Sequence, residues 1–157
     1  MSDRFILNLF ADLRKQILNI MTGLPENKLS LVPEGFNNNL HWQIGHVLTI
    51  TNDLIFVLSG AGSRIPSSYG TFFATGTSPS NWSEQPPEVH ILEKKLEEQM
   101  LVICEMYDGN LAEPVTAKDN FLQARVIGEL FYVLIAHEST HLGMITAMAK
   151  VLHANPE

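Results

Sequence analysis

Residues 127–153 read IGELFYVLIAHESTHLGMITAMAKVLH, and this stretch decides the fold class. Its apolar and histidine positions recur at alternating steps of three and four residues, which places them along one side of an α-helix. The members of this stripe are Ile127, Leu130, Leu134, His137, His141, Met144, Met148 and Val151. We therefore predict a long helix that begins near Asp119 or Asn120, continues to about His153 and buries the stripe against other helices.

Three further helical segments precede this stretch. The first covers residues 3–22, with a predicted core stripe of Phe5, Ile6, Leu9, Leu13, Ile17, Ile20 and Met21. The second runs from a cluster of asparagines to about residue 58, and the third runs from the prolines at 86 and 87 to about 108. Between them lies an irregular stretch, 61–85, with a short helix expected around 68–74.

Together these segments predict an all-α protein with one domain over residues 1–157. Four helices separated by three connections favour an antiparallel four-helix bundle, with one long crossover loop between the second and third helices. Long loops in compact domains are often functional, so we expect residues 61–85 to help shape a pocket.

The composition limits the classes of partner. The chain has 157 residues and a formal net charge of −7, and an acidic surface repels phosphate backbones and anionic lipid headgroups. No apolar run in the predicted helices reaches the roughly 20 residues needed to span a bilayer. The single cysteine, Cys104, excludes a disulfide scaffold within one chain and favours a reducing compartment. We expect a cytoplasmic protein that binds neither nucleic acid nor membranes.

The two histidines of the last helix are the first candidates for a functional site. His137 and His141 lie four residues apart, so they project from one side of the helix, and both fall on the predicted core stripe. Two buried imidazoles without partners would cost several kcal/mol, whereas one metal ion satisfies both. A His-x-x-x-His pair on a helix is a typical ligand pair for zinc, nickel and similar divalent ions.

A third ligand must come from upstream. His46 is the best candidate, because it lies on a second stripe of the buried second helix, with Gly45 beside it to allow close approach. His41 remains the alternative, although its place near the helix start favours a rim position. Three neutral imidazoles leave coordination positions open for water or substrate, a pattern typical of catalytic rather than structural metal sites.

Two acidic residues near these histidines are candidate catalytic groups. Asp53 follows His46 by seven residues on the same stripe, where it would either orient an imidazole or remain a solvated acid. Glu138 completes a His-Glu-x-x-His motif, in which zinc peptidases use the glutamate as a general base. The chain lacks the downstream ligands of both peptidase versions. Glu138 is therefore either a group that acts on an activated water molecule or a polar residue beside the stripe.

Two segments of the chain resemble the signatures of a known family. Residues 39–47, NLHWQIGHV, are similar to the second-helix signature of the DinB-like superfamily, and residues 137–145, HESTHLGMI, are similar to its last-helix signature. The crossover region also resembles that of the family at Tyr69, Phe72, Gly76 and Pro79. The resemblance implies an up-down-down-up bundle, a zinc or nickel ion on His46, His137 and His141, and a homodimer.

The resemblance also implies a range of activities. Members of the family transfer low-molecular-weight thiols such as bacillithiol or mycothiol in metal-dependent reactions, and relatives include isomerases and hydrolases. Met144 stands where many relatives have a glutamine after Gly143, so a polar group near the site is absent here. We expect a metal-dependent transferase that joins a low-molecular-weight thiol to a small electrophilic substrate. The alternatives are a metal-dependent hydrolase that activates water and a non-catalytic metal-binding stress protein.

Overall fold

The computed structural model describes residues 2–154, and this part of the chain is all-helical, as the sequence predicts. The predicted domain limits at 1 and 157 lie outside the described residues. The elements are α1 Asp3–Thr22, α2 Glu26–Leu29, α3 Leu40–Thr51, the π-helical turn η1 Asn52–Val57, α4 Tyr69–Phe73, the 3₁₀ turn η2 Pro79–Asn81, α5 Val89–Tyr107 and α6 Ile127–Ala154. None of the helices in this described part is long and apolar enough to cross a membrane.

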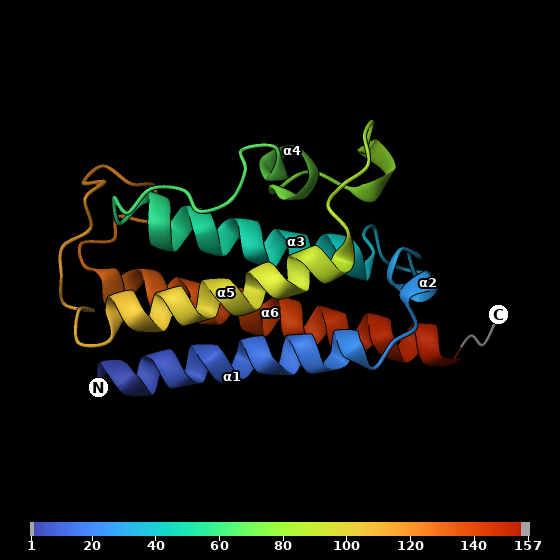
Figure 1. Ribbon diagram of the computed structural model, residues 1–157, viewed down its shortest axis with the longest axis horizontal. Coiled ribbons are helices and arrows are strands. Elements are labelled where there is room, and N and C mark those ends of the chain that lie inside the picture. The colour runs from blue at the N-terminus through green and yellow to red at the C-terminus, as the bar shows by residue number, and fades with distance from the viewer. Residues whose placement is uncertain (1, 155–157) are drawn as a thin grey trace.

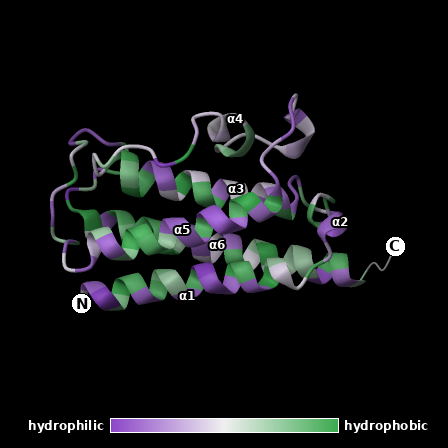
Figure 2. Cartoon of the chain, in the orientation of Figure 1, coloured by the Kyte–Doolittle hydropathy of each residue, from purple (hydrophilic) through white to green (hydrophobic). Residues whose placement is uncertain are grey.

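The four longer helices lie side by side (Figure 1). Helix α1 contacts α5 and α6, and α3 contacts the same two helices, so the four enclose a common interior. In Figure 1, α1 and α6 run in one direction and α3 and α5 in the other, with α4 packed on the outside of α3. Hydrophobic residues recur along all four, and hydrophilic residues alternate with them on α1 (Figure 2).

The interior holds two hydrophobic clusters separated by a polar layer. The first cluster includes Ile17, Ile44, Leu96 and Ile145. The second cluster includes Phe10, Ile55, Ile103 and Leu134. Between them, each long helix contributes a buried polar side chain: Arg14, Thr51, Gln99 and Glu138. Buried polar groups are costly unless they bond one another, so this layer must be satisfied internally.

Helix α6 begins at Ile127, several residues after the predicted start near Asp119 or Asn120. The residues before it form a turn instead. The Asn120 side chain accepts a hydrogen bond from the amide of Ala124 and donates to the carbonyls of Ala117 and Ala124. Asparagine side chains compete with helical hydrogen bonds in this way, and here the tertiary contacts favour the turn.

The buried side of α1 also differs in part from the predicted stripe. Phe5 and Leu9 are 55% and 40% exposed, whereas Leu7, Phe10 and Arg14 are buried. The buried face is turned toward Leu7, Phe10 and Arg14 because α1 packs against both α5 and α6. An arginine therefore lies on the buried face.

The second predicted helix is one continuous helical segment, α3 followed by η1. Asn39 caps it, since its side chain accepts a hydrogen bond from the amide of Trp42. Gly60, with φ of 89°, ends it in the left-handed region that favours glycine. The π-helical turn widens the last part of the helix, and such turns are frequent at functional sites. It carries Asp53.

Candidate metal centre

The three histidines named from the sequence lie together in the structure. His46 comes from α3, and His137 and His141 come from successive turns of α6. Each offers a ring nitrogen, and these three atoms all lie within 4.8 Å of one another. The Nε2 atoms of His46 and His137 are 3.2 Å apart. Two nitrogens bound tetrahedrally at 2.0–2.1 Å would be about 3.3 Å apart, so this spacing suits a shared divalent ion.

Burial keeps these imidazoles neutral, the form that binds a metal. His46 and His141 are 6% and 8% exposed, and His137 is partly buried. Burial lowers the pKa of His137 to about 4, helped by His46 and Arg14, and lowers the pKa of His141 to about 3, helped by the other two histidines. Burial also lowers the pKa of His46, against a hydrogen bond to the carbonyl of Phe73. The site therefore offers free lone pairs at neutral pH.

Hydrogen bonds at the opposite ring nitrogens select the tautomer. Nδ1 of His46 lies 2.6 Å from the carbonyl oxygen of Phe73, and Nδ1 of His141 lies 2.6 Å from Oε1 of Gln43. Because both partners accept, each Nδ1 carries the proton and each Nε2 keeps its lone pair for the cluster. The Nδ1 atom of His137 is buried and has no hydrogen-bond partner in the described part of the chain.

Residues of the 61–85 stretch position His46. The indole of Trp42 stacks on the His46 ring, with centroids 4.5 Å apart, and donates to Oγ1 of Thr77. The Phe73 ring packs against the backbone of Gly45, where a Cβ atom would collide with it. The expected close approach at Gly45 is thus confirmed, and it brings the Phe73 carbonyl to His46. This stretch shapes the site through contacts that sequence spacing does not reveal.

His41, the alternative third ligand, lies elsewhere. Its Nε2 atom is 2.7 Å from the carbonyl oxygen of Pro87, and its ring contacts Phe73 and Trp82. It does not join the group of ligand atoms formed by the other three histidines among the described residues. His41 therefore packs the start of α3 against the entry to α5.

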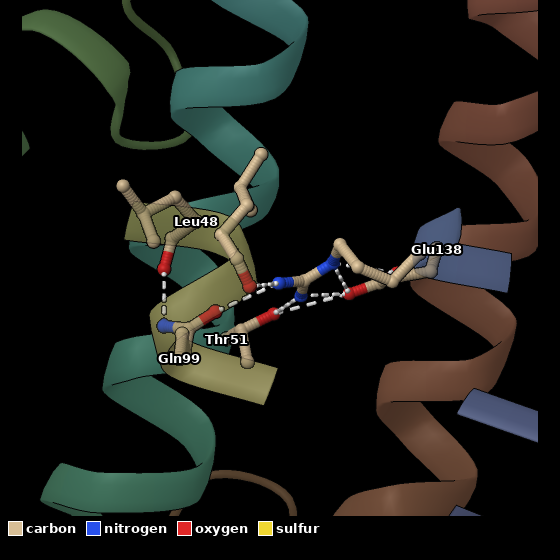
Figure 3. Close-up of polar contacts among 6 residues, drawn as sticks. Leu48, Thr51, Gln99 and Glu138 are labelled. Atoms are coloured by element: carbon tan, nitrogen blue, oxygen red, sulfur yellow. Dashed lines mark hydrogen bonds and ion pairs between the residues drawn. The ribbon is translucent and has the colours of Figure 1, made fainter. Parts of the chain in front are cut away.

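Glu138 is fully buried and belongs to the polar layer. Arg14 donates to both of its carboxylate oxygens, through Nε at 3.1 and 3.2 Å and through a short contact from Nη2. The same guanidinium bonds the carbonyl of Leu96, Oε1 of Gln99 and Oγ1 of Thr51. Figure 3 shows Thr51 and Gln99 on one side of this network and Glu138 on the other.

This network joins the four long helices directly beside the ligand pair. Burial raises the pKa of the Glu138 carboxyl, and the attraction and hydrogen bonds of Arg14 oppose that rise. Glu138 precedes His141 by one turn of α6 and follows His137 directly, so fixing Glu138 also fixes the helix that carries both ligands. Its carboxylate does not line the cavity beside the histidines.

Asp53 does line that cavity. The cavity has a volume of about 560 Å³, a size typical of small-molecule sites, and all three histidines form part of its wall. The exposed carboxylate of Asp53 accepts a hydrogen bond from the Asn52 side chain at 3.1 Å. Asp53 thus shares the cavity wall with the three histidines, whereas Glu138 does not line that cavity.

Sequence reasoning did not find three of the site's supporting groups. Arg14 lies on the α1 stripe between Phe10 and Ile17, and a charge at such a position is a signal for a buried partner. Gln43 lies between apolar residues of a helix buried on all sides, which is a similar signal. The third group, the backbone carbonyl of Phe73, leaves no trace in the residue types.

The described histidine cluster can bind a divalent metal ion, because its donor set, neutral tautomers and spacing fit such an ion. No curated protein matches the chain. The profile of the DinB superfamily matches residues 9–145, a range that contains the three histidines, Gln43, Arg14 and Glu138. This match covers most of the chain, and the chain belongs to the DinB superfamily.

Proposed function

We propose that this protein is a metal-dependent transferase that joins a low-molecular-weight thiol to a small electrophilic substrate. The observation that carries the proposal is the convergence of three neutral imidazole nitrogens in the wall of a cavity. Three ligands from the protein leave positions for a substrate, as in catalytic sites. A zinc or nickel ion suits this donor set. When bound, the ion would lower the pKa of a thiol and so favour the thiolate.

The residues of the chain have separate roles in this proposal. His46, His137 and His141 hold the ion through their Nε2 atoms. Gln43 and the Phe73 carbonyl hold the protons at two Nδ1 atoms, which keeps the Nε2 lone pairs available. The Trp42 ring covers one face of His46 and excludes water there.

The two acidic residues are proposed to act differently. Asp53 accepts the proton when the S–H bond of the thiol breaks, because its carboxylate lies in the cavity wall. The sulfur then forms a bond to the electrophilic carbon, and the leaving group departs with its electron pair. Glu138 acts through Arg14 as a positioning residue, because its oxygens bond that guanidinium.

The test is thiol transfer by the zinc- or nickel-loaded protein. The assay supplies a panel of thiols, with 1-chloro-2,4-dinitrobenzene as the electrophile, and follows the coloured thioether product. We expect turnover that requires metal, is lost in His46→Ala and is retained in His90→Ala, which alters an exposed histidine. If none of the thiols in the panel supports metal-dependent turnover, the proposal is contradicted.

A hydrolase is the second candidate, because the carboxylate of Asp53 in the cavity wall would serve water as well as a thiol. In that case Asp53 would accept a proton from water, and an aryl ester would be cleaved without any thiol. Ester hydrolysis that needs metal but not thiol, and that falls in Asp53→Asn, would replace the transferase by the hydrolase. Tight metal binding without either activity would instead favour a non-catalytic metal-binding protein.

The proposal also covers the helix topology, the oligomeric state and the cellular location expected from the sequence and from the family. We assign the four long helices to an up-down-down-up bundle with residues 58–88 as its crossover, supported by the helix directions in Figure 1. A homodimer and a cytoplasmic location are also proposed. Size-exclusion chromatography with light scattering tests the dimer, since a monomeric mass would contradict it.

A further inference from the structure

The cavity beside the histidines has an almost wholly apolar wall. It is built mainly from the aliphatic side chains Ile50, Leu54, Val57, Leu58, Leu122 and Val133. Phe121 and Thr75 complete it beside the histidines and Asp53. Apolar walls gain free energy by releasing water when an apolar group enters, about 25 cal/mol per Å² of buried surface. The occupant should therefore present a mainly hydrophobic body.

The charge of the wall is equally one-sided. Among the cavity-lining residues that the structure describes, Asp53 is the one formally charged side chain at neutral pH, and no lysine or arginine lines the wall. The nearby buried cation, Arg14, is already bonded to Glu138. Away from the histidines, whose bound ion would itself add positive charge, an anionic group would lose hydration in the apolar cavity, find no cationic side chain and face a carboxylate.

Part of this wall comes from the connector before α6. Phe121 and Leu122 lie in the turn that Asn120 fixes through its bonds to Ala117 and Ala124. The turn therefore contributes an apolar surface to the same cavity as the π-helical turn that carries Asp53 and Val57.

We infer that this cavity binds the acceptor substrate and that this substrate is an uncharged or cationic molecule with an aromatic or branched aliphatic body. Carboxylate and phosphate groups are selected against in the apolar part of the cavity, away from the histidines and the ion that they would hold. The inference rests on the proposed function in one respect, namely that the histidines mark the reacting end of the cavity. A thiol that carries several carboxylates is accordingly not the molecule that fills this apolar space.

The test compares three probes with the same ring system: naphthalene-2-methanol, 2-naphthylmethylammonium and 2-naphthoate. Binding to the metal-free, full-length protein is measured by calorimetry at neutral pH, so that no carboxylate can ligate a metal. We expect the neutral and cationic probes to bind, and the anionic probe to bind up to about fivefold more weakly, the upper range for one exposed charge. Asp53→Asn should narrow that gap.

A charge introduced at the cavity rim provides a sharper test. Val57 is 46% exposed and lines the cavity, so Val57→Lys should strengthen binding of 2-naphthoate relative to the neutral probe. Leu101→Lys is the matched control, since Leu101 is 72% exposed on α5 and does not line the cavity. This control should leave the order of the three probes unchanged.

Three results would overturn the inference: no binding of any probe, a preference of the wild type for 2-naphthoate, or equal effects of the two lysine variants. None of these measurements depends on metal or on turnover. A failed thiol-transfer assay with the expected probe order would therefore reject the proposed reaction and leave the substrate class standing. Metal-dependent turnover together with a preference for 2-naphthoate would support the proposed reaction and reject the substrate class.

Discussion

Replacing Gln43 with methionine should weaken metal binding without unfolding the protein. Oε1 of Gln43 lies 2.6 Å from Nδ1 of His141, and both residues are buried. Methionine has a similar length but lacks a strong acceptor, so the N–H of His141 would lose its partner. The other end of the amide, Nε2, has no hydrogen-bond partner among the described residues, so its removal should cost little stability.

The magnitude follows from the cost of an unpaired buried donor. In the metal-free variant, the imidazole of His141 can hold its proton on Nε2, beside the lone pairs of the other histidines. Metal binding would force that proton back to an Nδ1 without a partner, at a cost of about 1–3 kcal/mol. This cost corresponds to roughly 5- to 150-fold weaker binding, which agrees with the 10- to 100-fold effects typical of residues that orient metal ligands.

The assay is competition for zinc between the protein and a chromophoric chelator, with circular dichroism as the check on folding. Gln43→Glu retains an acceptor and should bind zinc at least as tightly as the wild type. Thr49→Val is the matched control on the same helix, since the buried Thr49 hydroxyl donates to the backbone carbonyl of Gly45 and contacts neither His141 nor Gln43 by a hydrogen bond in the described residues. A folded Gln43→Met variant with unchanged zinc affinity would refute the role assigned to this hydrogen bond.

Three further predictions concern the surroundings of the site. Gly45→Ala should lower the free energy of unfolding by about 1–3 kcal/mol in urea titrations, because the new Cβ displaces the Phe73 ring, and it should weaken zinc binding as well. Glu138→Gln should cost about 3–5 kcal/mol in the same titration, because it leaves the Arg14 guanidinium buried without a countercharge. Replacing both Arg14 and Glu138 by methionine should recover most of the lost free energy of unfolding. The thermal stability of the metal-free protein should fall as the pH drops from about 6.5 towards about 4. Over that range the unfolded chain takes up protons on histidines that stay neutral when folded, and a flat stability profile would contradict this.

The sequence predicted the long helices well where an amphipathic pattern and a local stop signal agree. The first predicted helix has the observed bounds, Asp3–Thr22, and the predicted short helix around 68–74 is α4. The start of α6 was missed because the Asn120 turn depends on contacts between distant segments. One of these contacts is the hydrogen bond that the amide of Ala117 donates to the carbonyl of Leu58, 3.2 Å away.

In the candidate site, too, the sequence predicted local features and missed contacts between distant residues. His137 and His141 were found together because four-residue spacing is a local property of one helix. The buried stripe of α6, however, includes Glu138, Ile145 and Leu152 where the sequence predicted His137, Met144 and Val151 as core positions. Glu138 can be buried because Arg14, 124 positions away in the chain, supplies its countercharge. Pairing over that distance has no local signature.

The roles of Gln43 and the Phe73 carbonyl were likewise beyond sequence reasoning. Whether an amide or a carbonyl meets an imidazole nitrogen depends on how α3, α4 and α6 pack. The sequence did indicate one part of this arrangement, namely the close approach that Gly45 permits because it has no side chain.

The most direct test of the account is the metal content of the purified protein and of its histidine variants. After loading with zinc or nickel and removal of free ion, elemental analysis should give one divalent ion per chain for the wild type. His90→Ala should retain the ion, whereas His46→Ala and His141→Ala should lose it while their circular dichroism remains helical. A wild-type protein without stoichiometric metal under any loading condition, or a His46→Ala variant that binds metal as the wild type does, would contradict the three-histidine centre.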